Sequence, residues 1–247
     1  MQILETEQGR QIAYHHTPGT GPTVVFCSGL KSDMEGTKAV HLEAWAKALG
    51  QAFLRFDYSG HGESSGAFED GCIGDWHEDT VAAICALTEG PLIVVGSSMG
   101  GWQALLLARA RPERLAGMVT IAAAPDFTED GYWASFTDEQ KAMLESQGFV
   151  TLPSDYDEGY IISKRLIEEG RDRLVLRAPL DLPFPVRFLQ GTDDSAVSTE
   201  TAIKLLDHAS GDDMRLTLVK GADHRFSTPE CLTLIETSVA DVLNGGQ

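Results

Sequence analysis

The sequence is poor in the features that mark disulfide-stabilised, metal-binding and membrane-spanning proteins. Its four cysteines in 247 residues are widely spaced and form no C-x-x-C pair: Cys27, Cys72, Cys85 and Cys231. Such spacing indicates neither a disulfide framework nor a zinc site, so reduced thiols fit best. No segment approaches the roughly 18 uninterrupted apolar residues of a membrane-spanning helix. We therefore expect no stable membrane insertion.

Basic residues are also scarce. The chain has 19 Lys and Arg against 37 Asp and Glu, which gives a formal net charge of −18. A field of this sign repels phosphate backbones and promotes solubility, so nucleic-acid binding is not expected. Residues 1–20 contain neither an apolar signal segment nor an amphipathic, Arg-rich leader. These absences predict a cytoplasmic protein.

What the sequence does contain is a regular alternation of short apolar runs and helical stretches. Gln2–Glu7 and Arg10–Thr17, separated by Gln8-Gly9, predict an antiparallel hairpin at the sheet edge. The next apolar runs are too short for helices and predict strands at Thr23–Cys27, Ala52–Phe56, Leu92–Gly96 and Met118–Ala122. Helical periodicity between them predicts helices at Thr37–Leu49, Asp75–Thr88 and Met99–Ala110. Buried strands alternating with helices predict a mostly parallel sheet with right-handed crossovers.

From about residue 125 to 182 this alternation lapses. Two helix-like pieces, Asp138–Gln147 and Glu158–Glu169, predict a helical cap inserted into the fold. The alternation then resumes with predicted strands Val186–Leu189 and Arg215–Val219 and predicted helices Thr199–His208 and Pro229–Leu243. Residues 1–247 are therefore expected to form a single α/β domain with one cap insertion.

Ser98 lies at the centre of a G-x-S-x-G motif, Gly96-Ser97-Ser98-Met99-Gly100. The motif follows a predicted buried strand and opens a predicted helix, which is the context that gives it meaning. A sharp turn there leaves no room for side chains at the two glycines and lifts the serine hydroxyl clear of the sheet. Ser98 is the predicted nucleophile. The alternative is an ordinary strand-to-helix turn.

A serine hydroxyl needs a base, and the base needs an orienting acid. In folds with this motif the chain order is serine, acid, histidine, which leaves His208 and His224 as candidate bases. His224 lies in a Gly-containing loop after a strand, where functional side chains are often presented. His208 falls within a predicted helix and is expected to be a solvated helix-end residue. We predict that His224 is the base.

Two adjacent aspartates compete for the role of the acid. Asp193 and Asp194 both follow the run Val186–Leu189, so both emerge at the carboxyl end of a predicted strand. The spacing from Gly191 and the following Val197 favours Asp194 and leaves Asp193 as a turn or capping residue. Asp194 is the predicted acid, and Asp193 stays open as the alternative.

Acyl transfer also requires donors for the negative charge that develops on the carbonyl oxygen. Backbone N–H groups are sufficient for this role. We predict those of Met99, directly after the nucleophile, and of Leu30, in the loop Ser28-Gly29-Leu30-Lys31 that follows a strand.

No motif for a cofactor or metal is evident. The Gly-rich segment from Arg55 to Ser64 lacks the strand-G-x-G-x-x-G-helix arrangement of a dinucleotide site and is interpreted as a structural turn. Phosphate-binding loops and H-E-x-x-H are absent, and the seven histidines do not cluster with carboxylates at metal-ligand spacing. We expect neither cofactor nor metal.

Aromatic residues gather in and beside the cap. They would line an acyl pocket or form the cap's own small core, and the sequence leaves both interpretations open. The residues are Trp102, Phe127, Tyr132, Trp133, Phe136, Phe149, Tyr156 and Tyr160.

With these residues placed, the chain resembles the serine hydrolases of the α/β-hydrolase superfamily over essentially its whole length. Within them it is most similar to the mitochondrial palmitoyl-protein thioesterases that also hydrolyse acyl glucuronides. The similarity lies in the stretches around Phe26–Lys38, Arg55–Gly60, Val95–Trp102 and Asp223–Arg225. It implies an α/β-hydrolase fold, a Ser98–Asp194–His224 triad and deacylation of thioesters or activated esters. Ser28 departs from the many members that carry His before the glycine.

The predicted function is therefore that of a serine hydrolase, cleaving carboxylic esters or acyl thioesters through an acyl-enzyme on Ser98. The expected partner is a small ester or thioester, or an acylated protein. Two alternatives stay open: a non-catalytic ligand-binding protein that keeps the scaffold, and an acyltransferase or C–C hydrolase that uses the same triad.

Overall fold

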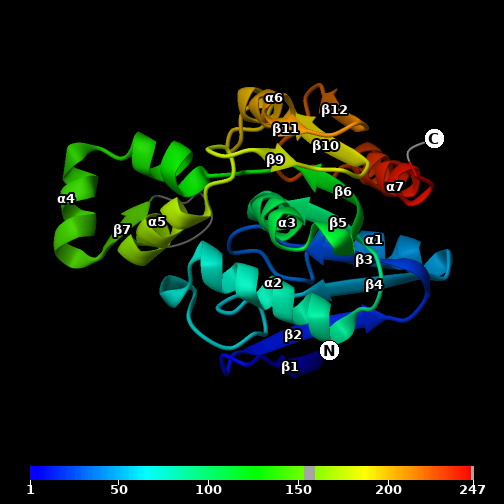
Figure 1. Cartoon of the computed structure of the whole chain (residues 1–247). Coiled ribbons are helices and arrows are strands. Elements are labelled where there is room, and N and C mark those ends of the chain that lie inside the picture. Colours follow the sequence, from blue (N-terminus) through cyan, green and yellow to red (C-terminus); the bar gives the residue numbers. More distant parts are fainter. Residues whose placement is uncertain (153–158, 246–247) are drawn as a thin grey trace.

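The computed structural model describes residues 1–152 and 159–245 and is built around one large sheet (Figure 1). Its eight strands run in the order β1-β2-β4-β3-β5-β6-β10-β12. The strands are β1 (Gln2–Glu5), β2 (Gln11–Thr17), β3 (Thr20–Cys27), β4 (Gln51–Phe56), β5 (Leu92–Ser97), β6 (Leu115–Ile121), β10 (Val186–Gly191) and β12 (Met214–Val219). β2 pairs antiparallel with β1 and β4, whereas every pair from β4 to β12 is parallel. The predicted mostly parallel sheet with an N-terminal hairpin is confirmed.

Helices cover both faces of this sheet because its central strands are apolar on both sides. In β3 the buried neighbours Val24 and Val25 belong to different hydrophobic cores. The core around Val24 includes side chains of α1 (Thr37–Ala48) and α7 (Pro229–Leu243). The core around Val25 includes α2 (Ile73–Leu87), α3 (Met99–Ala110) and α6 (Thr199–His208), of which α2 and α3 lie on the near face in Figure 1.

The cap, here residues 125–182, leaves the sheet after β6 and returns to it at β10. Most of it lies beyond the carboxyl ends of the parallel strands, at the left of Figure 1, whereas residues 180–181 pair with residues 209–210. Its elements are η3 (Phe127–Trp133), α4 (Asp138–Gln147), β7 (Phe149–Leu152), β8 (Tyr160–Ser163), α5 (Lys164–Gly170), η4 (Arg171–Arg173) and β9 (Leu180–Asp181). The remaining short elements are η1 (Phe68–Asp70), η2 (Pro112–Arg114) and β11 (Ala209–Ser210).

The cap is less helical than the sequence predicts. The helix expected at Glu158–Glu169 is wrong in its first half, because Tyr160–Ser163 forms β8, paired antiparallel with β7. Bulky Tyr160, Ile161 and Ile162 suit a pleated strand better than a helix. The helix begins only after Ser163, whose hydroxyl accepts the N–H of Leu166 at 3.1 Å. Tyr156 and Glu158 lie outside the described residues.

A buried carboxylate joins the two chain segments that connect the cap to the sheet. Asp126 is fully buried and has the left-handed φ of 58° at the entry to η3. Its carboxylate accepts the N–H groups of Val175 and Leu176, at 2.7 and 3.0 Å, and an Arg177 guanidinium N–H at 3.0 Å. The outgoing and returning segments of the cap are thereby fixed to one another.

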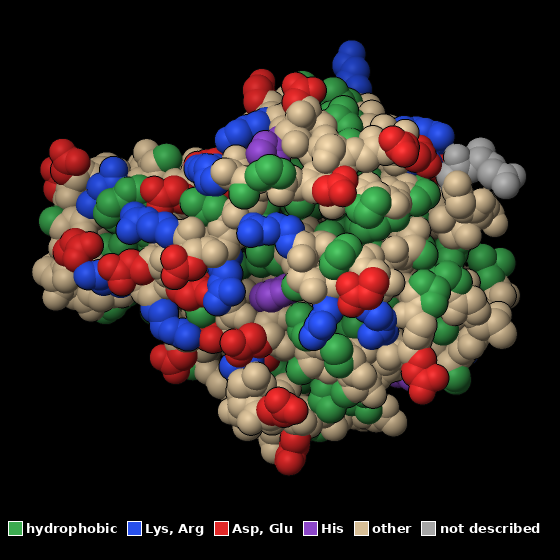
Figure 2. Space-filling model, in the orientation of Figure 1, with side chains coloured by type: hydrophobic (Ala, Val, Ile, Leu, Met, Phe, Trp, Pro, Cys, Tyr) green, Lys and Arg blue, Asp and Glu red, His purple; other side chains and the backbone are tan. Residues whose placement is uncertain are grey.

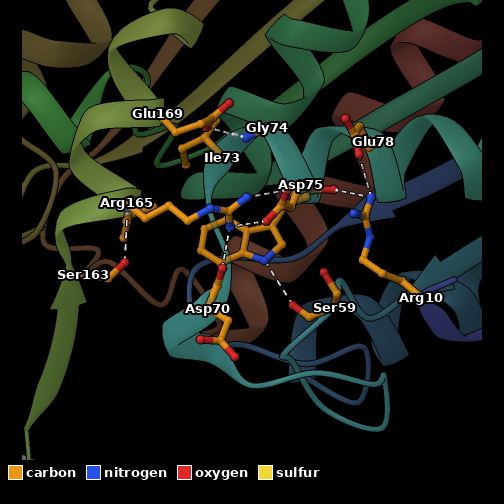
Figure 3. Close-up of polar contacts among 12 residues, drawn as sticks. Arg10, Ser59, Asp70, Ile73, Gly74, Asp75, Glu78, Ser163, Arg165 and Glu169 are labelled. Atoms are coloured by element: carbon orange, nitrogen blue, oxygen red, sulfur yellow. Dashed lines mark hydrogen bonds and ion pairs between the residues drawn. The ribbon is translucent and has the colours of Figure 1, made fainter. Parts of the chain in front are cut away.

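A second attachment holds α5 against the first turn of α2 (Figure 3). The Glu169 carboxylate accepts the backbone N–H of Gly74 at 2.8 Å, where the helix dipole of α2 favours negative charge. Arg165 donates to the Asp75 carboxylate at 3.0 Å and to the carbonyl oxygen of Asp70. These contacts dock the base of the cap on the core.

On the face that Figure 2 shows, the charged side chains do not gather in a single patch. Acidic and basic groups are interspersed there, including on the cap lobe at the left. Within residues 1–152 and 159–245, no helix combines the length and the apolar character needed to cross a bilayer.

Candidate active site

Ser98 occupies a strained turn between β5 and α3. Its φ of 56° and ψ of −118° are rare for a residue with a side chain, and strain of this kind is concentrated at functional sites. A Cβ at Gly96 would lie 2.3 Å from the Gly100 carbonyl oxygen, and one at Gly100 would lie 2.0 Å from the Cys27 carbonyl oxygen. Both motif glycines are therefore required by close backbone approach, as the sequence predicts.

The loops at the carboxyl ends of β10 and β12 bring Asp194 and His224 to Ser98. His224 Nε2 lies 3.1 Å from Ser98 Oγ, and His224 Nδ1 lies 2.8 Å from Asp194 Oδ2. The side chain of His224 is about one third exposed, whereas that of Asp194 is fully buried. This continuous chain of hydrogen bonds has the geometry of a nucleophile, a base and an orienting acid.

The surroundings of Asp194 favour its ionised form. Burial by itself would raise the pKa of this carboxyl, but hydrogen bonds from His224 and from the N–H groups of Val197 and Ala196 hold the pKa below its usual value. The adjacent Asp193 is exposed, and its backbone N–H donates to the Ala222 carbonyl. Of the two aspartates, Asp194 is the one in contact with the imidazole.

His208 lies apart from this site, at the end of α6. Its Nε2 contacts the carbonyl oxygen of Ala178 at 2.8 Å, and the residue forms the last turn of the helix. This contact indicates a structural role for His208.

The loop between β3 and α1, residues 28–36, runs beside the nucleophile. A Cβ at Gly29 would lie 3.3 Å from Ser98 Cβ, so the residue before Leu30 lies beside the nucleophile. The turn from Gly29 to Ser32 is closed by a 3.1 Å hydrogen bond between its end residues, with Lys31 at a left-handed φ of 54°. Met99 opens α3, so its N–H lies at the positive end of that helix. Leu30 follows Gly29 and Met99 follows Ser98 in the chain, and the role of their N–H groups as donors stays a prediction.

Sequence reasoning missed the residue that holds this loop. Asp57 is buried, and its carboxylate accepts the N–H of Met34 at 2.6 Å and that of Glu63 at 3.0 Å. A Cβ at Gly62 would lie 2.1 Å from Asp57 Oδ2, which explains the glycine there. Burial raises the pKa of Asp57, while the two backbone N–H groups oppose the rise. The signal was the Gly-rich segment that follows β4, from which Asp57 binds the β3–α1 loop.

Gln190 is a second residue that sequence reasoning missed. It is fully buried at the end of β10, and its amide nitrogen donates to Asp194 Oδ2 at 3.1 Å. The same nitrogen donates to the Val197 carbonyl at 2.9 Å and to that of Gly191 at 3.1 Å. Gln190 thus holds the loop that carries Asp194. Its position directly before Gly191 was the available signal in the sequence.

Several of the aromatic residues form one packed row between the cap and α3. Ring centroids are separated by 5.5 Å for Trp102 and Phe127, by 5.4 Å for Phe127 and Tyr132, and by 6.1 Å for Tyr132 and Phe136. The Trp102 indole also donates to the Arg173 carbonyl at 3.1 Å. This row supports the cap-core interpretation of these four residues.

Metal ligands do not gather in the part of the chain that the structure describes. Within it, no group of three or more His, Cys, Asp or Glu side chains is arranged to hold an ion. The expectation that the chemistry needs neither metal nor cofactor stays a prediction.

Comparison with known proteins agrees with this architecture. A family model described as "alpha/beta hydrolase fold" matches residues 22–151. The mitochondrial palmitoyl-protein thioesterase ABHD10 of Bos taurus is 35% identical over 238 residues, which cover 94% of this chain and 76% of the relative.

Two solved structures are similar over nearly the full length. A protein from Agrobacterium vitis S4 superposes with a TM-score of 0.93 at 37% identity, covering 98% of this chain and 97% of the other. Mouse ABHD10 superposes with a TM-score of 0.91 at 33% identity, covering 98% of each chain. With the family model matching more than half of its length, the chain belongs to the α/β-hydrolase family.

Proposed function

We propose that this protein is a serine hydrolase that cleaves carboxylic esters or acyl thioesters through an acyl-enzyme on Ser98. One observation carries the proposal: His224 lies 3.1 Å from Ser98 Oγ on one side and 2.8 Å from Asp194 Oδ2 on the other. A positioned base makes the hydroxyl nucleophilic, and a buried carboxylate keeps the imidazole in the tautomer that can accept a proton.

The reaction has two halves. Ser98 Oγ attacks the acyl carbon while its proton passes to His224 Nε2, and the N–H groups of Leu30 and Met99 stabilise the negative carbonyl oxygen. The tetrahedral intermediate then expels the alcohol or thiol, which takes the proton from His224. Water attacks the acyl-enzyme by the same route in the second half, releasing the acid and regenerating Ser98.

The names of the relatives favour thioesters among the possible substrates. The ABHD10 proteins of Bos taurus and Mus musculus are called palmitoyl-protein thioesterases, and the match to them covers 94% and 99% of this chain. Esters and thioesters share the acyl-enzyme route, so the proposed substrates are small esters, small thioesters and acylated proteins. The relatives are also called mitochondrial, and a cytoplasmic location for this chain stays a prediction.

Removal of the Ser98 hydroxyl tests the proposal. Ser98→Ala should lower kcat towards p-nitrophenyl butyrate and butyryl thioesters by a factor on the order of 10⁴ or more. Ser146→Ala, which removes an exposed hydroxyl from α4, serves as the matched control and should retain normal turnover. Near-normal rates in Ser98→Ala would overturn the proposal.

Labelling with a fluorophosphonate separates an enzyme from an inactive scaffold. An activated serine reacts covalently with this probe, so the wild type should be labelled and Ser98→Ala should not. A wild-type protein that resists the probe while binding an acyl ligand would support the non-catalytic alternative instead.

A further inference from the structure

Lys31 lies in the β3–α1 loop, one residue after Leu30, the predicted donor to the carbonyl oxygen. It has the left-handed φ, 54°, in the turn from Gly29 to Ser32. This conformation favours glycine and asparagine, so a lysine keeps it only where its surroundings hold it in place. Contacts of the Lys31 side chain are therefore expected to stabilise the turn.

The Lys31 ammonium lies over two aromatic rings. Its Nζ is 4.9 Å from the ring centroid of Phe68 and 5.0 Å from that of Tyr160. Both distances are within the roughly 6 Å at which a cation is attracted to the face of an aromatic ring. Within residues 1–152 and 159–245, the ammonium makes no hydrogen bond or ion pair, so these two rings are the contacts that hold it there.

The two rings belong to different parts of the molecule. Phe68 is in η1, and its ring stacks on that of Trp76 at a centroid distance of 5.9 Å and makes a T-shaped contact with His61 at 5.4 Å. Both of these partners are buried, so Phe68 is fixed to the core. Tyr160 begins β8, the strand of the cap that pairs with β7. Lys31 thus connects the loop beside the nucleophile to the core and to the cap.

We propose that Lys31 is a positioning residue for acyl transfer, because its contacts with the two rings hold the turn in which Leu30 lies. The inference rests on the proposed function, in which the Leu30 N–H stabilises the negative carbonyl oxygen. That N–H takes no part in the hydrogen bond that closes the turn, which runs from the N–H of Ser32 to the carbonyl oxygen of Gly29 at 3.1 Å. The position of Leu30 therefore depends on the shape of the turn, and the turn needs a left-handed φ at Lys31.

The size of the effect follows from the strength of the two contacts. The Lys31 side chain is exposed, and an exposed cation–π contact changes an equilibrium constant by a factor of about 2 to 5. Two such contacts together favour the held turn about tenfold. A donor to the carbonyl oxygen contributes a factor on the order of 10²–10³ to kcat, so loss of the contacts removes part of that contribution.

The experiment compares Lys31→Met, which keeps an unbranched side chain without its charge, with Lys31→Arg, which keeps a cation that can lie over the rings. The assay measures kcat and KM for p-nitrophenyl butyrate and the inhibition constant of propylboronic acid. This inhibitor forms a tetrahedral adduct with an activated serine and resembles the transition state at the carbonyl oxygen. Lys31→Met should lower kcat about tenfold and raise the inhibition constant by a similar factor, with KM unchanged. Lys31→Arg should stay within about twofold of wild type.

The ring in the cap gives a test from the other side of the contact. In a Tyr160→Leu background the ammonium has lost one of its two rings, so Lys31→Met should lower kcat only about threefold there. Comparing the two backgrounds removes any separate effect of Tyr160 on activity. A tenfold loss in both backgrounds would show that the ammonium acts without this ring and would overturn the proposal.

A matched control separates these contacts from net charge. Lys47 is exposed in the last turn of α1, so Lys47→Met removes an equal charge at the far end of that helix and should leave kcat and the inhibition constant unchanged. If Lys31 only stabilises the fold, Lys31→Met lowers the unfolding temperature while both quantities stay at their wild-type values. A rise in KM alone would make Lys31 a substrate contact. Either result, or a Lys31→Arg variant as slow as Lys31→Met, overturns the proposal.

Failure of the proposed function would be recognised separately. If Ser98→Ala hydrolyses p-nitrophenyl butyrate as fast as wild type, that function fails, and amide hydrogen exchange in residues 29–32 decides whether Lys31 holds the turn. Exchange should then be about tenfold faster in Lys31→Met than in wild type and in Lys31→Arg. Equal exchange rates in all three proteins overturn the role of Lys31.

Discussion

Replacement of Asp194 by Asn changes one functional group and leaves the shape of the side chain intact. In the wild type, Oδ1 accepts the N–H groups of Ala196 and Val197, both at 2.8 Å, and an Asn oxygen can preserve these two bonds. The Asn nitrogen then replaces Oδ2 opposite His224 Nδ1 and the Gln190 amide nitrogen. The introduced amide and that of Gln190 would both present N–H donors at that contact.

The size of the fall in kcat depends on the tautomer that His224 adopts in this variant. An N–H donor facing Nδ1 favours the tautomer with the proton on Nε2, which then points at Ser98 Oγ and cannot accept its proton. We expect kcat to fall by a factor on the order of 10³–10⁴, or about 4–5.5 kcal/mol of transition-state stabilisation. KM should change little because Asp194 is fully buried and does not meet the substrate.

The assay is steady-state hydrolysis of p-nitrophenyl butyrate by Asp194→Asn and by its neighbour variant, Asp193→Asn. Asp193 is exposed, so its variant should stay within about threefold of wild type. A larger loss in Asp193→Asn than in Asp194→Asn would refute the assignment of the acid. Retention of more than a tenth of the wild-type kcat by Asp194→Asn would refute the tautomer argument.

Two further predictions concern stability. Asp126→Ala leaves the buried N–H groups of Val175 and Leu176 without their acceptor, so we expect the free energy of unfolding in urea to fall by about 2–5 kcal/mol; a change below about 1 kcal/mol would contradict the role of this carboxylate. The lowered pKa of Asp194 means that the folded state binds its proton less tightly than the unfolded state, whose Asp pKa is about 3.9. Its stabilisation should therefore be present above about pH 4 and be lost as the pH falls through the lowered folded value, so urea unfolding of wild type and Asp194→Asn should converge in acid. A constant difference between them down to about pH 2 would contradict this sign.

The sheet and its helices could be predicted because their patterns are local. The run Leu92–Gly96 is apolar at every position but its last, and the structure buries every residue of β5 on both faces of the sheet. The elements of the cap were harder to predict from the sequence because they are short and partly exposed. At Tyr160–Ser163 an apolar pattern fitted a helix as well as a strand, and only pairing with β7, across a segment outside the described residues, selects the strand.

The residues of the candidate site also divide into those that the sequence could predict and those that it could not. Ser98, His224 and Asp194 follow strands in a motif or a fixed chain order, so position in the sequence was enough to nominate them. Gln190 contacts the segment that directly follows it, within seven positions of sequence, whereas Asp57 meets Met34 of another loop across 23 positions. Contacts of this kind depend on how loops meet in space, which periodicity and motif spacing do not encode.

The carboxylate of Asp126 has a practical consequence for engineering. Because this carboxylate accepts the N–H groups of Val175 and Leu176, it holds the two ends of the insertion together. Residues 127–174 are thus a natural cassette, and a chimaera that keeps Asp126 and residues 175–177 preserves the junction. Grafting other caps at this junction would test whether the cap influences substrate choice, while Ser98, Asp194 and His224 stay in place.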